Sequence, residues 1–130
     1  MILLTNSAEQ TVEPGASVTF DTVAIKTGCG ECHRDGSSSV TLRLCGTYEA
    51  AFSANLGGVA AGAVSLSLNV DGDPLGQMDA VTAAAGDLAS VSYTTAVRNC
   101  SDGASRITVT NNGAAAVTVT SPSLLVRRVA

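Results

Sequence analysis

The sequence predicts an all-β protein whose antiparallel strands fold as a sandwich or a closed barrel. From residue 88 onward, β-branched and aromatic residues such as Val91, Tyr93 and Val97 alternate with small polar ones. The turn Asn111-Asn112-Gly113 separates two later runs of this kind. Alternation with period two and an Asn-Gly turn are typical of antiparallel strands, and no segment has helical periodicity of useful length.

Nine apolar runs define the expected strands, and all belong to one domain over residues 1–130. The parity of the apolar positions shifts between Phe20 and Val23, which predicts a β-bulge. A turn at Asp71-Gly72-Asp73 ends the fourth run. Residues 1–16 are expected to form a short N-terminal arm, a candidate attachment segment. Residues 124–129 are expected to form a central, buried strand. The runs cover residues 18–25, 40–44, 48–56, 64–70, 75–81 (a short edge strand), 88–97, 107–109, 117–119 and 123–130.

Composition excludes several classes of function. The chain has 130 residues, enough to bury a core without disulfides or a metal, and 45% are apolar, mostly Ala, Val and Leu. Small aliphatic side chains suit the thin core between two facing sheets. With a net charge of −4, one lysine (Lys26) and 3% aromatic residues, the chain is not expected to bind nucleic acid.

No membrane segment or export signal is expected either. The longest weakly polar run, residues 56–68, is interrupted by glycines and serines and ends in alternation, which suits a strand. The apolar stretch at residues 1–4 is too short for the core of a signal peptide. Many outward positions are Ser, Thr or Ala. This low charge favours association with other copies, and a well-hydrated surface is the alternative.

The segment Cys29-Gly-Glu-Cys32-His33 matches the C-x-x-C-H pattern of covalent haem attachment. His33 would be one axial ligand, and Met78 is the candidate for the other. The surrounding Gly, Asp and Ser residues and the scarcity of aromatic side chains argue against a porphyrin. We therefore predict no haem and no other cofactor.

The four cysteines leave two further interpretations open. Cys29, Cys32 and Cys45, with His33 or Cys100, would supply four zinc ligands, but a structural zinc site usually has two paired knuckles and this chain has one. Disulfides among Cys29, Cys32, Cys45 and Cys100 allow three pairings, and at least one disulfide is expected. Buried free thiols are the remaining alternative.

No catalytic constellation stands out, so an enzyme is not expected. With a single histidine, nucleophilic catalysis would depend on His33 alone. The Asp71-Gly72-Asp73 segment matches part of a calcium loop but lacks the other ligands, so it is expected to be only a hairpin turn.

Three segments carry a resemblance to a known family. They are Tyr48–Asn55 followed by Gly62–Leu68 and Asp71-Gly72, then His33-Arg34-Asp35-Gly36-Ser37 followed by Val40–Arg43, and the alternating C-terminus from Ile107 to Ala130. Over nearly the whole chain, the sequence resembles bacteriophage and prophage head-fibre or capsid-decoration proteins. These are similar to the C-terminal domain of collagen-like spore-surface glycoproteins.

The resemblance implies a tumour-necrosis-factor-like jelly roll that assembles as a tight trimer. In the family, a cysteine pair precedes the His-Arg element and further cysteines match Cys45 and Cys100, which makes the C-x-x-C-H match a coincidence. The pair is spaced more closely here than in the family, so the family's disulfide pattern is not carried over. The module begins without the collagen-like stalk, which favours a stand-alone decoration protein.

The expected function is that of a non-enzymatic virion protein on the outside of a phage capsid. It would be made in the host cytoplasm without a signal peptide and would contact itself and the major capsid protein. It would stabilise the shell or present an adhesive surface to a host or mucus glycan. Its cysteines would stay reduced during assembly and oxidise after lysis. The alternatives are a receptor- or glycan-binding jelly roll of a fibre or of a bacterial or spore surface, and a metal- or haem-binding protein.

Overall fold

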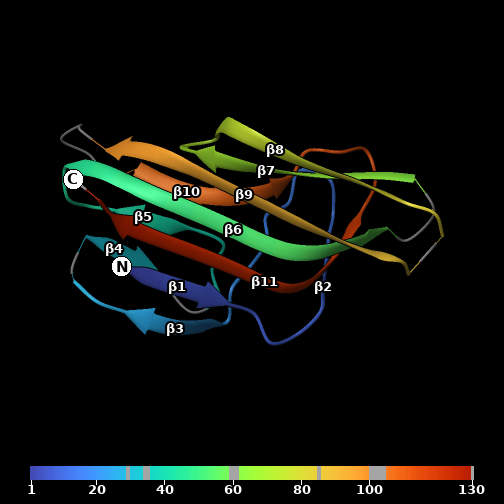
Figure 1. The fold of residues 1–130 in the computed structure, drawn as a ribbon, viewed down its shortest axis with the longest axis horizontal. Helices are drawn as coiled ribbons and strands as arrows, with labels where there is room; N and C mark the ends of the chain where they lie inside the picture. The colour runs from blue at the N-terminus through green and yellow to red at the C-terminus, as the bar shows by residue number, and fades with distance from the viewer. Residues whose placement is uncertain (29, 34–35, 59–61, 85, 100–104, 130) are drawn as a thin grey trace.

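The computed structural model is a sandwich of two antiparallel β-sheets (Figure 1). It describes residues 1–28, 30–33, 36–58, 62–84, 86–99 and 105–129. Among these residues there are eleven strands and no helix, so the predicted fold class is confirmed. The strands are β1 (Ile2–Thr5), β2 (Gln10–Val12), β3 (Thr22–Lys26), β4 (Glu31–His33), β5 (Val40–Leu42), β6 (Gly46–Gly58), β7 (Gly62–Val70), β8 (Asp73–Thr82), β9 (Leu88–Asn99), β10 (Ser105–Asn111) and β11 (Val117–Arg128).

The six-stranded sheet has the order β3-β1-β11-β6-β9, with β2 also paired to β11. The five-stranded sheet has the order β4-β5-β10-β7-β8. The C-terminal strand β11 lies between β1 and β6, as the prediction of a central strand required. Val126 is fully buried there, whereas Val129 lies just beyond the strand and is exposed.

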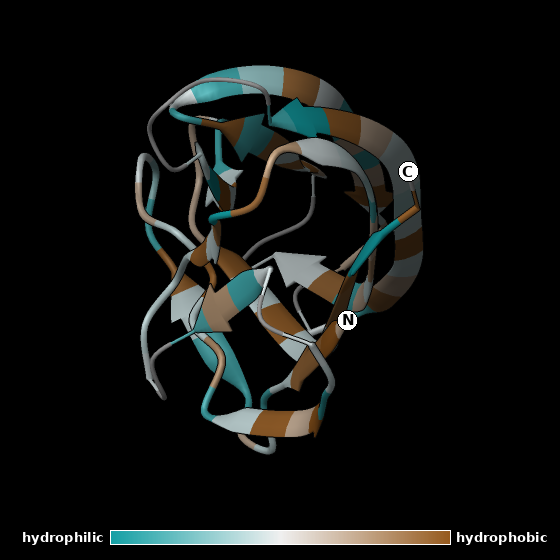
Figure 2. Ribbon diagram, turned by 90° about the vertical axis from the view of Figure 1, so that its left-hand side faces the viewer, coloured by the Kyte–Doolittle hydropathy of each residue, from teal (hydrophilic) through white to brown (hydrophobic). Residues whose placement is uncertain are grey.

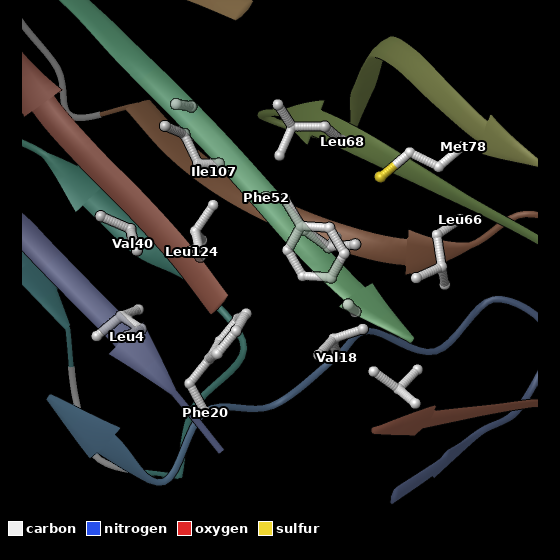
Figure 3. Packing of buried hydrophobic residues seen from close by; sticks show 14 of the residues in the cluster. Leu4, Val18, Phe20, Val40, Phe52, Leu66, Leu68, Met78, Ile107 and Leu124 are labelled. Carbon is white, nitrogen blue, oxygen red and sulfur yellow. The ribbon is translucent and has the colours of Figure 1, made fainter. Parts of the chain in front are cut away.

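The core fills the space between the two sheets. Most strands of the core alternate buried and outward positions, and brown and pale bands alternate along the ribbons in Figure 2. β7 is an exception, because it also buries the polar Ser67 and Asn69. Figure 3 shows side chains from both sheets pointing toward one another, among them Leu4, Phe52 and Leu124 of one sheet and Leu66 and Ile107 of the other. Aliphatic residues and two phenylalanines make this layer close-packed.

Residues 1–16 do not form an arm separate from the sandwich. β1 lies between β3 and β11, and Ile2 and Leu4 are fully buried in the core. β2 pairs with the start of β11 and buries Val12. Met1 to Leu4 are all apolar, so the sequence has no period-two pattern here, although burial alternates along the strand.

The parity shift between Phe20 and Val23 is a change of sheet rather than a β-bulge. Val18 hydrogen-bonds to Val109 of β10, at the five-stranded sheet, whereas Val23 pairs with Leu4 of β1 in the other sheet. A register irregularity does occur further along, where the β1–β3 pairing passes from Leu3 to Leu4. The chain therefore crosses the sandwich between these two apolar residues.

The two predicted turns have different outcomes. Val70 pairs with Asp73, and both Asp71 and Gly72 have positive φ angles of 52° and 87°, so this is the tight hairpin turn that was expected. The Asn111-Asn112-Gly113 turn does not close a hairpin, because β10 belongs to the five-stranded sheet and β11 to the six-stranded one. The turn carries the chain from one layer to the other.

Candidate functional site: the outward faces of the two sheets

The outward face of the six-stranded sheet carries a row of apolar side chains. Strand register places Ile25 of β3 beside Leu3 of β1, Leu3 beside Leu125 of β11, and Leu125 beside Ala51 of β6. Ile25 is 43% exposed, and Leu3 and Leu125 are half-buried. We call these four residues the apolar row. Solvation of such a row is unfavourable, so it marks a surface that another molecule can cover.

The rest of this outward face is polar but nearly uncharged. Alternate positions of β11, β6 and β9 carry small hydroxyl and amide side chains, namely Thr118, Thr120, Ser123, Ser53, Asn55, Ser90, Ser92 and Thr94. Charge appears in the cross-strand pair of Arg127 with Glu49, whose Nε and Oε1 atoms are 3.3 Å apart. These two charges neutralise each other, whereas the exposed Arg98 of β9 lies on the same face opposite Thr47, so the face carries few charges.

The outward face of the five-stranded sheet is different in charge. Near β4 and β5 it holds a shallow depression of about 380 Å³ lined by Cys32, His33, Ser37, Ser39, Thr41, Arg43 and Arg106. The two arginines are exposed, and no carboxylate is among the described residues that line it. This is a local concentration of positive charge on a chain whose net charge is −4.

His33 lines this depression, and both of its ring nitrogens face backbone carbonyl oxygens. Its Nδ1 atom lies 2.9 Å from the carbonyl oxygen of Ser39, and its Nε2 atom lies 3.1 Å from that of Phe20. Each ring nitrogen therefore has a backbone partner. Met78, the candidate second haem ligand, is buried in β8 at the opposite edge of the five-stranded sheet from His33 in β4, so the two cannot share an iron.

The structure gives no support to the predicted disulfide at the two described cysteines. Cys32 and Cys45 are both free thiols. Cys32 lies in the edge strand β4, where its cross-strand neighbour is Thr41, and Cys45 is exposed before β6. Cys29 and Cys100 lie outside the described residues. Among the residues that are described, no three His, Cys, Asp or Glu side chains are placed to hold a metal ion.

A buried carboxylate lies on the other side of the β4 edge. Glu31 is 2% exposed, and its Oε2 atom is 3.0 Å from the amino group of Met1. The hydroxyl of Tyr48 donates a 2.7 Å hydrogen bond to the carbonyl of Leu44. Burial raises the pKa of Tyr48, and the charge of Glu31 raises it further. These contacts join the start of β1 to the β4–β5 edge.

Sequence reasoning anticipated the low charge of an outward face but missed the apolar row. Leu3 falls within the expected arm of residues 1–16, and Leu125 falls within the strand of residues 124–129 that is expected to be buried. Strict alternation along residues 124–126 is the signal that separates Leu125 from its buried neighbours.

The fold is that of tumour-necrosis-factor and C1q jelly rolls. The globular domain of zebrafish complement 1qA superposes with a TM-score of 0.75 at 10% identity, over 99% of this chain and 96% of that one. The Eiger TNF of S. frugiperda gives a TM-score of 0.76 at 13% identity, over 99% and 92%. The vertex protein P5 of phage PRD1 gives 0.60 at 13% identity, over 99% and 96%.

No protein-family model matches the chain, and no curated protein matches its sequence. At these identities the similar structures define the fold alone. In the part of the chain that the structure describes, no helix is long and apolar enough to cross a membrane.

Proposed function

We propose that this protein is a non-enzymatic structural protein of a phage virion, which assembles as a trimer on the outside of the capsid. It is made in the host cytoplasm and contacts the major capsid protein, and it reinforces the shell or presents an adhesive surface. The sequence resemblance to head-fibre and decoration proteins supports this assignment. The fold it implied, a tumour-necrosis-factor-like jelly roll, is the observed one.

The observation that carries the proposal is the apolar row on a nearly uncharged sheet face. A solitary β-sandwich usually presents charges on such a face. Here Ile25, Leu3 and Leu125 lie side by side, and the nearby Arg127 and Glu49 compensate each other. Three copies arranged around an axis would remove this row from water, and closed symmetry would leave no copy with the row uncovered.

Native mass spectrometry of matched variants tests the assembly. We expect the wild-type chain to appear at three times its mass of 12.9 kDa. Leu125→Asp places a charge in the apolar row and is expected to give monomers with an unchanged far-UV spectrum, because the side chain points away from the core. Thr108→Asp places the same charge on the outward face of β10 and should leave the trimer intact. A monomeric wild-type chain, or equal effects of both variants, would contradict the proposal.

The virion role has its own test. Particles assembled without this protein should lose infectivity faster on heating, or should adsorb to cells more slowly, than particles that carry it. If particles that lack the protein are as heat-stable as complete particles and adsorb equally well, then both the structural and the adhesive role are wrong.

A further inference from the structure

The depression beside β4 and β5 has the chemistry of an anion site. Strand register places Cys32, Thr41 and Arg106 in one row across β4, β5 and β10, all on the outward face. Arg43 follows Thr41 by two residues and is exposed on the same side. The site therefore contains two guanidinium groups that point outward from neighbouring strands, with hydroxyl groups between them.

The backbone of each arginine is held in place. The amide of Arg43 donates a 2.9 Å hydrogen bond to the carbonyl of Gly30, which extends the β4–β5 pairing. The amide of Arg106 donates to Oδ1 of Asp71 at 2.9 Å, and the amide of Asp71 donates to the carbonyl of Arg106 at 2.9 Å. The Oδ1 atom of Asp71 therefore accepts from a backbone amide, and no ion pair between Asp71 and an arginine side chain is found among the described residues.

The polar side chains of the site are mainly donors. Guanidinium groups cannot accept hydrogen bonds, and the hydroxyls of Ser39 and Thr41 can donate. His33 is not free to accept from a ligand, because both of its ring nitrogens face backbone carbonyls. A ligand with acceptor oxygens and negative charge therefore suits the described side chains of the site. Each guanidinium group can bind a planar or tetrahedral oxyanion through two parallel hydrogen bonds.

We infer that this depression binds the carboxylate or sulfate group of an acidic saccharide. Its volume of about 380 Å³ lies within the roughly 300–1,000 Å³ typical of small-molecule sites. Hydroxyls beside the arginines suit the hydroxyls of a sugar ring. A nucleic acid fits less well, because no Phe, Tyr or Trp is among the described residues that line the depression, and the chain is acidic overall. This inference goes beyond the assembly proposed above and does not depend on it.

Binding to surface-coupled polymers tests the inference. At low ionic strength we expect the wild-type protein to bind dextran sulfate or polygalacturonate and not neutral dextran. Arg43→Gln with Arg106→Gln should weaken this binding at least about tenfold. The matched control, Lys26→Gln with Arg128→Gln, removes the same charge at exposed positions away from the depression and should change binding less than about twofold.

Three results would overturn the inference: no binding to either acidic polymer, equal loss in the two double variants, or equally tight binding of single-stranded DNA. Complete displacement by an equal concentration of inorganic sulfate would show that the site recognises the ion and not the saccharide.

Native mass spectra of all variants separate this test from that of assembly. If a variant forms the same oligomer as the wild-type protein but no longer binds the polymer, the change affects the anion site and not assembly. The Leu125→Asp monomer should retain the site but bind the polymer with lower avidity.

Discussion

The ring of Tyr93 covers the backbone of Gly76, and its hydroxyl donates a 3.2 Å hydrogen bond to the carbonyl of Leu75. Tyr93 belongs to β9, an edge of the six-stranded sheet, and Gly76 belongs to β8, an edge of the five-stranded sheet. A Cβ atom at position 76 would overlap the tyrosine ring. The missing side chain at Gly76 therefore allows the two sheet edges to approach each other along this side of the sandwich.

Gly76→Ala is expected to lower the free energy of unfolding by about 1–3 kcal/mol, because the ring or the strand must move to admit the methyl group. Urea unfolding at one fixed chain concentration measures this, since the stability of an oligomer depends on concentration. Adding Tyr93→Ala to the Gly76→Ala variant should remove the overlap. The double variant should therefore lose less free energy of unfolding than the sum of the losses of the two single variants. Additive costs would contradict the assigned contact.

Asn111 joins the start of the chain to the turn that leads into β11. Its Nδ2 atom donates to the carbonyls of Val12 at 2.9 Å and Ala115 at 2.8 Å, and its Oδ1 accepts from the amide of Gly113 at 2.9 Å. The residue is 1% exposed. We expect Asn111→Ala to cost about 2–4 kcal/mol of stability, because three backbone groups lose their partners.

The neighbouring asparagine is the control for this prediction. Asn112 is exposed and accepts one 2.7 Å hydrogen bond from the Ser65 hydroxyl. Asn112→Ala should therefore cost less than about 1 kcal/mol in the same urea experiment. Equal effects at the two positions would show that the buried amide of Asn111 has no special role.

Alkaline pH should destabilise the fold through Tyr48. Burial, and then the charge of Glu31, raise the pKa of this phenol above that of an exposed tyrosine. The folded chain therefore holds the proton more tightly than the unfolded chain, so stability is unaffected below about pH 10 and falls as the pH rises above it. Tyr48→Phe should flatten this decline. It should also cost about 1 kcal/mol at neutral pH, because the hydrogen bond to Leu44 is lost.

Thermal or urea unfolding between neutral and strongly alkaline pH provides the measurement for Tyr48. Tyr93→Phe serves as its control, because the Tyr93 hydroxyl lies at the exposed β8–β9 contact. That variant should keep the alkaline decline of the wild-type chain. A Tyr48→Phe variant with an unchanged decline would assign the effect to another group.

Much of the fold could be predicted from alternation along single strands. Residues 64–70 and 88–97 showed one buried face clearly, and both became long strands, β7 and β9. What alternation could not show is which sheet a strand joins. The Asn111–Gly113 turn has the residues of a hairpin but connects two layers, because pairing between distant segments decides strand order.

The candidate sites were harder to predict because they depend on register between distant strands. Leu3 and Leu125 are far apart in sequence, and only the β1–β11 pairing makes them neighbours. Arg43 and Arg106 line one depression because the β5–β10 pairing places Arg106 opposite Thr41, two residues before Arg43. The C-x-x-C-H pattern was visible in sequence, but the backbone carbonyls that hold the His33 ring could not be read from it.

Val126→Asp tests the placement of β11. Val126 is fully buried at the centre of the six-stranded sheet, where a carboxylate would have neither water nor a cation to compensate it. We expect a loss of more than about 4 kcal/mol, enough to prevent folding. The adjacent Leu125→Asp introduces the same charge on the opposite face and should leave the chain folded. Circular dichroism and solubility of the two purified variants distinguish these outcomes. A soluble Val126→Asp chain with a wild-type spectrum would mean that the other face of β11 lies on the core.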